Sequence, residues 1–313
     1  MLYVFYNEID TNQCAPAVLA QLDNPDVRAV PAGMDLFRFR NKVSRALLWL
    51  GFLLGIPLPF NFSKDFLRIL KDVKQSDSVL IFGSSICISL RIAFPFCKYC
   101  KAGKKYRWIW DTILTPKDEA WLFDLKKYFD VWTFDILDAK KYGLTYKNTV
   151  CALLEKTMDE GFDCDVYFVG YDRGRYDFLN GLYESLTQMG LTCKFMVVRD
   201  EASPKAEKSV KLLKEGIPLK ENYKNLERAR AVLDIPTSGQ NGLTQRTLEG
   251  LFLGRKVITS NVFAKEEKLF NEKDIFILGE RQISELPTFI RSPFVPVDVA
   301  PYTINEWVKE FMA

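Results

Sequence analysis

The segment 232–261 contains a short apolar run, a polar loop, a helical pattern and a second apolar run in direct succession. Residues 232–235 are apolar, 236–242 are rich in turn formers, 244–253 have helical spacing, and 257–259 are β-branched. Parallel strands need a crossover connection, usually a helix, so this succession favours a parallel sheet. The segment therefore predicts an α/β fold with a polar loop at the carboxyl end of a strand.

The same alternation of strand and helix patterns extends along the rest of the chain. We expect strands at residues 2–6, 27–30, 78–82, 106–110, 131–134, 166–169 and 193–198, and helices at 117–128, 176–189, 223–228 and 304–311. The chain has 313 residues, 48% of them hydrophobic, which is enough for two domains of about 150 residues. We place their junction between residues 142 and 163.

Polar residues around the helix pattern of segment 232–261 predict a ligand site. In open α/β sheets, ligands bind beyond the carboxyl ends of the strands, where a helix N-terminus offers N–H groups to an anion. Arg246 adds a positive charge there, and Glu249 lies one turn further on. This combination indicates a nucleotide-sugar pocket, with phosphate near Arg246 and a ribose on Glu249. The alternative is a solvated Glu249 paired with Arg246 or Arg255.

Two short stretches add candidates for the same pocket. Gly170, Asp172, Arg173 and Arg175 follow the strand pattern 166–169, where guanidinium groups and tight glycine turns suit a diphosphate. The alternative is an ordinary basic surface loop. The loop and first helical turn of segment 232–261 supply the remaining donor-binding candidates, which are Gln240, Gly242 and Thr244. Thr244 is also suited to capping the helix.

These residues carry a family resemblance. Glu249 shortly before a β-branched strand resembles the donor-site helix of GT-B glycosyltransferases, and FVGYDRGRYDFL (168–179) and WTFDILDAKKYGLTY (132–146) resemble bacterial enzymes that build lipopolysaccharide and capsular glycans. The resemblance implies two Rossmann-like domains with mainly parallel sheets facing a central cleft. Residues 1–150 would bind the acceptor and 151–313 the nucleotide-sugar donor, and the last helix, about 303–313, would pack back on the first domain.

The resemblance also implies the reaction, which is transfer of a hexosyl or deoxyhexosyl group to a lipopolysaccharide or capsule acceptor at the cytoplasmic membrane face. Retaining members of that group usually have a Glu eight residues before the one matched by Glu249, and this chain has Asn241 there. Inversion and retention therefore both stay open. Two alternatives remain, a non-catalytic two-domain protein that binds a sugar or nucleotide, and a nucleotide-sugar epimerase on the same fold.

The sequence contains no histidine, so a general base has to be Asp or Glu. The candidates follow predicted strands of the first domain, namely Asp10, Asp111 and Glu8. Each is also a typical loop or cap residue. We expect Asp135 and Asp138 to cap a short helix.

We expect no metal and no cofactor. Asp163 and Asp165 form an Asp-x-Asp motif, but it precedes a strand, whereas the motif in metal-dependent transferases acts at a strand end. Cys97 and Cys100 form a single CxxC pair without a second pair of ligands. The chain lacks a P-loop and a GxGxxG turn, which argues against a kinase or a nicotinamide dehydrogenase.

A basic and apolar passage, residues 37–61, is the candidate acceptor and membrane region. Its 15-residue apolar run is interrupted by Gly and Pro, whereas a transmembrane helix needs about 20 residues. The passage is either a segment that lies in the membrane interface or a buried helix preceded by solvent-exposed basic residues. The candidate residues of the region, including two lysines of a second cluster, are Arg38, Arg40, Lys42, Arg45, Trp49, Lys104 and Lys105.

The net charge of +3 gives no reason to expect a nucleic acid partner. Seven scattered cysteines and an N-terminus unlike a signal peptide favour reduced thiols in the cytoplasm. Together with the basic and apolar passage 37–61, this leads us to expect a protein peripheral on the inner face of the cytoplasmic membrane.

Overall fold

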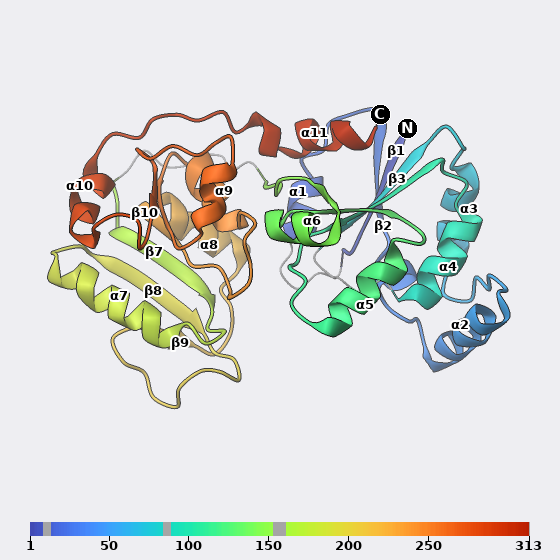
Figure 1. Cartoon of the computed structure of the whole chain (residues 1–313), viewed down its shortest axis with the longest axis horizontal. Coiled ribbons are helices and arrows are strands. Elements are labelled where there is room, and N and C mark those ends of the chain that lie inside the picture. The colour runs from blue at the N-terminus through green and yellow to red at the C-terminus, as the bar shows by residue number, and fades with distance from the viewer. Residues whose placement is uncertain (9–13, 84–88, 153–160, 313) are drawn as a thin grey trace. The chain divides into compact units, whose positions relative to one another are not determined.

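The computed structural model describes residues 1–8, 14–83, 89–152 and 161–312. The chain forms two compact units (Figure 1). Unit 1 comprises Met1–Ala152 together with Tyr302–Ala313, and unit 2 comprises Leu153–Pro301. Each unit contains one six-stranded sheet in which every pair of neighbouring strands is parallel. The predicted α/β class with parallel sheets is confirmed.

The sheet of unit 1 is wound in two directions from its first strand. In order across the sheet, its strands are β2 (Val27–Pro31), β1 (Leu2–Tyr6), β3 (Ser78–Gly83), β4 (Lys104–Ile109), β5 (Asp130–Thr133) and β6 (Thr145–Tyr146). The chain passes from β1 to β2 on one side and then to β3 on the other. The switch point of this sheet, where ligands bind in such folds, is therefore between β1 and β3.

Helices cover both faces of this sheet. In Figure 1, α3 and α4 lie on one side of β1 and β3, and α1 and α11 lie on the other. The helical segments of unit 1 are α1 (Cys14–Leu19), η1 (Gly33–Phe37), α2 (Lys42–Leu54), α3 (Lys64–Asp72), α4 (Leu90–Tyr99), α5 (Pro116–Leu125), α6 (Ile136–Tyr142), α11 (Ile304–Trp307) and η5 (Val308–Phe311).

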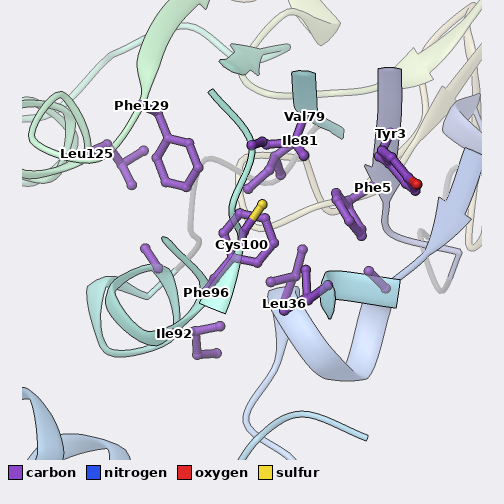
Figure 2. Packing of buried hydrophobic residues seen from close by; sticks show 14 of the residues in the cluster. Tyr3, Phe5, Leu36, Val79, Ile81, Ile92, Phe96, Cys100, Leu125 and Phe129 are labelled. Carbon is purple, nitrogen blue, oxygen red and sulfur yellow. The ribbon is translucent and has the colours of Figure 1, made fainter. Parts of the chain in front are cut away.

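The first face of the sheet packs on an aromatic core. Phe96 of α4 contacts Phe5 edge-on, with ring centroids 5.6 Å apart, and stacks on Phe129 at 6.2 Å. Figure 2 shows Cys100 among these rings. Burial raises the pKa of Cys97 to about 12 and also raises that of Cys100, so both thiols stay protonated. The CxxC pair is part of the core.

The second face is closed by the C-terminal segment. Trp307 is fully buried, its ring centroid lies 4.8 Å from that of Trp108, and its indole N–H donates to the carbonyl of Asn148 at 2.7 Å. Phe311 packs on Trp132 in the same cluster, with centroids 4.7 Å apart. Residues from the two ends of the sequence therefore share one hydrophobic core.

Unit 2 repeats the two-directional winding. In order across its sheet, the strands are β12 (Ile275–Ile277), β11 (Lys256–Thr259), β10 (Ala229–Asp234), β7 (Cys164–Tyr171), β8 (Cys193–Val198) and β9 (Lys211–Leu213). Its α-helices are α7 (Tyr176–Gln188), α8 (Leu219–Glu227), α9 (Gln245–Phe252) and α10 (Leu286–Arg291). The chain runs from β7 outward to β9 and returns to β10 on the other side of β7. The switch point of unit 2 is thus between β7 and β10.

Helix α9 packs very close to its sheet because Gly250 faces it. A Cβ atom at Gly250 would lie 3.0 Å from Val257 Cγ2 and 3.3 Å from Val232 Cγ2. The predicted strand–loop–helix–strand unit is thereby confirmed, with β10, α9 and β11 as its elements. No helix in the described part of the chain combines the length and apolar character that a bilayer crossing requires.

We predict that replacing Trp307 with Ala destabilises unit 1. Truncating a fully buried Trp typically costs about 3–5 kcal/mol, and the carbonyl of Asn148 also loses its donor. Denaturant unfolding of the full chain should show the loss. Glu306→Ala, on the exposed side of the same helix, is the control and should change stability little. Equal stability of the Trp307 variant and the parent would contradict this packing.

Candidate functional site

Polar side chains gather at the switch point of unit 2, beyond the carboxyl ends of β7 and β10. Asp234, the last residue of β10, is buried and accepts hydrogen bonds from the hydroxyls of Thr244 at 2.9 Å and Thr247 at 2.8 Å. Thr244 also caps α9, because its hydroxyl oxygen accepts the N–H of Arg246 at 3.1 Å. Asp234 therefore fixes the first turn of α9 against the strand end.

The sequence prediction missed Asp234. A signal was available, since an Asp at the end of a predicted strand is followed by Thr at both the cap and the third helical position. Burial raises the pKa of Asp234, while the two threonine hydroxyls, Arg246 and Arg175 act in the opposite direction. Its role is to position the helix.

Arg246 extends from the first turn of α9 towards β7. Its guanidinium donates to the carbonyl of Val169 at 3.0 Å and to the side-chain oxygen of Asn222 at 3.2 Å. Asn222 also accepts the buried hydroxyl of Tyr167 at 3.1 Å. A guanidinium has five N–H donors, so Arg246 is anchored through part of its donor set and retains donors for a ligand.

Glu249 is a buried carboxylate with an incomplete set of partners. It is 5% exposed, and its nearest cationic contact is Arg246 Nε at 3.8 Å from Oε2. This separation is too long for a hydrogen bond, and no described residue donates one to it. Burial raises the pKa of Glu249 to about 7, Arg246 lowers it, and Asp234 raises it further. The effect of burial on the pKa of Glu249 is therefore larger than the opposing effect of Arg246.

Arg175 and Arg173, next to each other after β7, have different surroundings. Arg175 is partly buried, donates to the carbonyls of Ile235, Asp172 and Tyr171, and lies over the ring of Phe168. Burial lowers its pKa, and the neighbouring cations lower it further. Through these contacts the Arg175 side chain ties the end of β7 to the end of β10, and its predicted contact with a diphosphate stays a prediction.

Arg173 is exposed and conformationally constrained. Its backbone has a φ of 46°, the only positive value outside glycine among the described residues. Its N–H donates to Asp200 at 2.7 Å, and its guanidinium reaches across to the hydroxyl of Thr237 at 3.1 Å. A left-handed conformation at Arg costs free energy and is held here by the loop contacts. The cation thus lies at the surface over the switch point.

Asp172 and Gly170 support the turn after β7. Asp172 is buried, and one carboxylate oxygen accepts the N–H of Tyr176 at 2.8 Å at the start of α7, while the other lacks a partner among the described residues. Gly170 allows close packing, since a Cβ there would lie 3.3 Å from Phe168 and 3.4 Å from Arg175. These contacts lie within the fold, and the donor-binding role predicted for Asp172 and Gly170 stays a prediction.

The loop after β10 is held by Asn261, which follows β11. The Asn261 amide donates to the carbonyls of Asn241 at 2.9 Å and Gly242 at 3.2 Å. Gln240 is partly exposed, and its N–H donates to the carbonyl of Thr237 at 3.0 Å. Asn261 therefore positions the loop that precedes α9.

The candidate bases of unit 1 lie at the carboxyl edge of its sheet, as far as the structure describes them. Glu8 follows β1 and accepts the N–H of Gly33 at 2.7 Å. A Cβ on Gly33 would lie 2.9 Å from that carboxylate, so a larger residue there would displace the Glu8 side chain. Asp111 follows β4 and is half-buried. Asp10 lies outside the described residues.

Asp135 and Asp138 form a buried carboxylate pair at the end of β5. Asp135 caps α6 by accepting the N–H groups of Leu137 at 3.0 Å and Asp138 at 3.2 Å. Asp138 accepts the N–H of Ile113 at 2.8 Å. Burial raises the pKa of Asp138 to about 6, the Ile113 N–H lowers it, and Asp135 raises it further. The capping predicted for Asp135 is confirmed, whereas Asp138 fastens the loop after β4.

The Asp-x-Asp motif lies at the amino end of β7, whereas the N-terminus of α9 lies beyond the carboxyl ends of the strands. Asp163 forms a bidentate ion pair with Arg228. Asp165 accepts the N–H and the hydroxyl of Thr192, at 2.9 Å and 3.0 Å. Both carboxylates are therefore engaged at the amino end of β7.

We predict that Glu249→Gln stabilises the fold at alkaline pH. Because the folded-state pKa is raised from 4.5 to about 7, the charged carboxylate is penalised in the folded state, and stability falls as pH rises through that window. The glutamine variant lacks this penalty and should exceed the parent by roughly 2–3 kcal/mol at pH 8, with the difference vanishing below pH 4.5. Thermal unfolding at both pH values measures it. Lower stability of the variant at pH 8 would instead show a stabilising ion pair with Arg246.

Comparison with known proteins identifies the fold. No family model and no curated protein matches the sequence. Among solved structures, an alpha-glucosyltransferase in complex with UDP and a 13-mer DNA has a TM-score of 0.53 at 9% identity, covering 100% of this chain and 95% of that one.

Two further solved structures give similar values. An alpha,alpha-trehalose-phosphate synthase (UDP-forming) from Burkholderia vietnamiensis has a TM-score of 0.51 at 9% identity, covering 94% of this chain and 92% of that one. The N-terminal domain of trehalose-6-phosphate phosphatase from Candida albicans has a TM-score of 0.50 at 10% identity, covering 99% and 92%. The chain thus has the two-domain α/β architecture of GT-B proteins.

Proposed function

We propose that this protein is a glycosyltransferase that binds a nucleotide-sugar donor at the switch point of unit 2. The observation that carries the proposal is Glu249, which is a buried carboxylate with a pKa of about 7 and without a hydrogen-bond donor among the described residues. Burying such a group costs stability unless a ligand supplies donors. The vicinal hydroxyls of a ribose are donors of this kind.

The residues around Glu249 suit the rest of a nucleoside diphosphate. The N-terminal end of α9 favours negative charge, and Arg246 and Arg173 add guanidinium groups on either side of the switch point. We assign the diphosphate to these three features and give Arg175 and Asp234 a positioning role. Stabilisation of the departing diphosphate by fixed positive charge makes a metal ion unnecessary.

Two solved structures with this fold support UDP as the nucleotide to test first. The alpha-glucosyltransferase was solved with UDP, and the trehalose-phosphate synthase is described as UDP-forming. For the acceptor, we propose a lipid-linked or lipopolysaccharide-type glycan at the cytoplasmic membrane face. This part is supported by the resemblance of segments 132–146 and 168–179 to enzymes of surface-glycan synthesis and by the basic, apolar surface of unit 1.

An inverting transfer also requires a general base, for which unit 1 offers Asp111, Glu8 and Asp10. Glu8 accepts the N–H of Gly33, and Asp111 is half-buried after β4, so both carboxylates are placed at the carboxyl ends of unit 1 strands.

We predict that UDP affinity depends on the charge of Glu249. Because ribose hydroxyls donate to the ionised carboxylate, affinity should fall by up to tenfold per pH unit below the pKa of about 7. Glu249→Gln should bind UDP more weakly at pH 8 and lose this dependence. The phosphate titrates equally in both proteins, so the difference isolates Glu249. Calorimetry measures the affinity, with Glu221→Gln on the surface of α8 as control. Parent-like affinity of the Glu249 variant would contradict the ribose assignment.

We also predict that a chelator leaves turnover intact. The full chain, incubated with a panel of nucleotide sugars and a membrane extract as acceptor source, should release nucleoside diphosphate at the same rate with and without EDTA. Arg173→Ala should slow this release without loss of stability, since its side chain is exposed, whereas Arg175→Ala should destabilise unit 2. Complete dependence on a divalent cation would refute the assignment of charge neutralisation to the guanidinium groups.

A further inference from the structure

Helix α2 is apolar on the side that faces solvent. It buries Ser44, Leu48 and Gly51 against unit 1. Its opposite face and the turn that follows it are also apolar, and each of these side chains is 45% to 67% exposed: Val43, Trp49, Leu50, Leu53, Leu54, Ile56 and Phe60. We call this set the α2 patch. An apolar helix face is normally buried. In this structure the outer apolar face of α2 is exposed to solvent.

The α2 patch is part of an ordered element. Asn41 and Ser44 form a capping box at the start of α2, and Gly55 ends the helix with a φ of 68°. The inner face is fastened to α4, where the ring of Phe52 lies 5.9 Å from that of Phe94. The hydroxyl of Tyr99 donates to the carbonyl of Pro57 at 3.1 Å and holds the turn. The exposed apolar side chains are therefore presented by a firmly capped helix.

The surroundings of the α2 patch carry positive charge. Residues 36–64 contain five cationic side chains and no acidic one, and residues 78–110, which include α4, also contain no acidic residue. Arg38, Arg40, Lys42 and Arg45 are exposed at the start of α2. At the other end, next to Tyr99, Lys98 and Lys101 are exposed. Among the described residues, Asp35 is the one acidic partner of these cations; it precedes the segment and pairs with Arg40 at 3.1 Å.

We propose that the α2 patch inserts into the interfacial zone of an anionic lipid bilayer. The 13-residue helix is about 20 Å long, which is too short to span a bilayer and suits a helix that lies in its plane. The apolar side chains enter the boundary between headgroups and acyl chains, and the cations at both ends contact lipid phosphates. This inference deepens the membrane contact in the proposed function and rests on that part of it.

Charge favours a bilayer over a second copy of the chain. A symmetric dimer brings the same patch of two copies together. The cations of segment 36–64 would then face one another without acidic partners, which is unfavourable at a desolvated contact. An anionic bilayer supplies the complementary charge.

The test uses the full chain and vesicles of phosphatidylcholine with or without phosphatidylglycerol. The parent should co-sediment with the anionic vesicles, and added salt should weaken the binding. Leu53→Ser combined with Leu54→Ser should weaken it by about tenfold or more, since two exposed side chains that would insert into the bilayer are lost. Phe178→Ser, at an equally exposed ring on α7 of unit 2, is the matched control and should leave vesicle binding unchanged.

UDP affinity and sedimentation velocity distinguish a failure of the α2 inference from a failure of the proposed donor site. UDP affinity should be equal in the parent, the double variant and the control, which shows that unit 2 is intact. Loss of UDP binding in every protein, with vesicle binding preserved, would reject the donor site and leave the α2 inference standing. Unchanged vesicle binding of the double variant would overturn the inference. A parent dimer that the double variant converts to monomer in sedimentation velocity would overturn it too.

Discussion

The buried carboxylate of Asp234 holds together the chain segments on which the candidate site depends. It joins the end of β10 to the cap and the first turn of α9 through two threonine hydroxyls. Without these bonds, the helix N-terminus would lose its fixed direction towards the switch point, and Arg246 and Glu249 would move with it. Because Asp234 is buried and its Oδ1 accepts from Thr244, removal of the Thr244 hydroxyl leaves an unsatisfied acceptor and costs about 1–3 kcal/mol.

The charged groups of the site divide into supports and candidates for ligand contact. Arg175 and one carboxylate oxygen of Asp172 bind backbone groups at the end of β7 and the start of α7, so these groups shape the turn. Arg173 is exposed in a strained conformation, and Glu249 is buried with few partners. Strain and unsatisfied burial both reduce stability, and proteins retain them mainly where a function requires them.

The sequence predicted the fold better than the site. Strand positions followed from apolar runs, and the predicted strands 2–6 and 193–198 match β1 and β8 residue for residue. Roles at the switch point were harder to predict, because a guanidinium bound to carbonyls and one open to solvent look alike in sequence. Arg175 turns inward to backbone carbonyls, whereas Arg173, with a φ of 46°, is exposed, and neither difference is visible in the sequence. Asp234 was missed because its partners are identified only once α9 is placed on the sheet.

The shared core of the two chain ends has a consequence for the order of assembly. Unit 2 is continuous in sequence, so it can fold once α10, which completes its core, has emerged from the ribosome. One face of the unit 1 sheet, by contrast, stays uncovered until Trp307 and Phe311 have been synthesised. Until then the rings of Trp108 and Trp132 lack these packing partners, and truncation before residue 302 would make that exposure permanent.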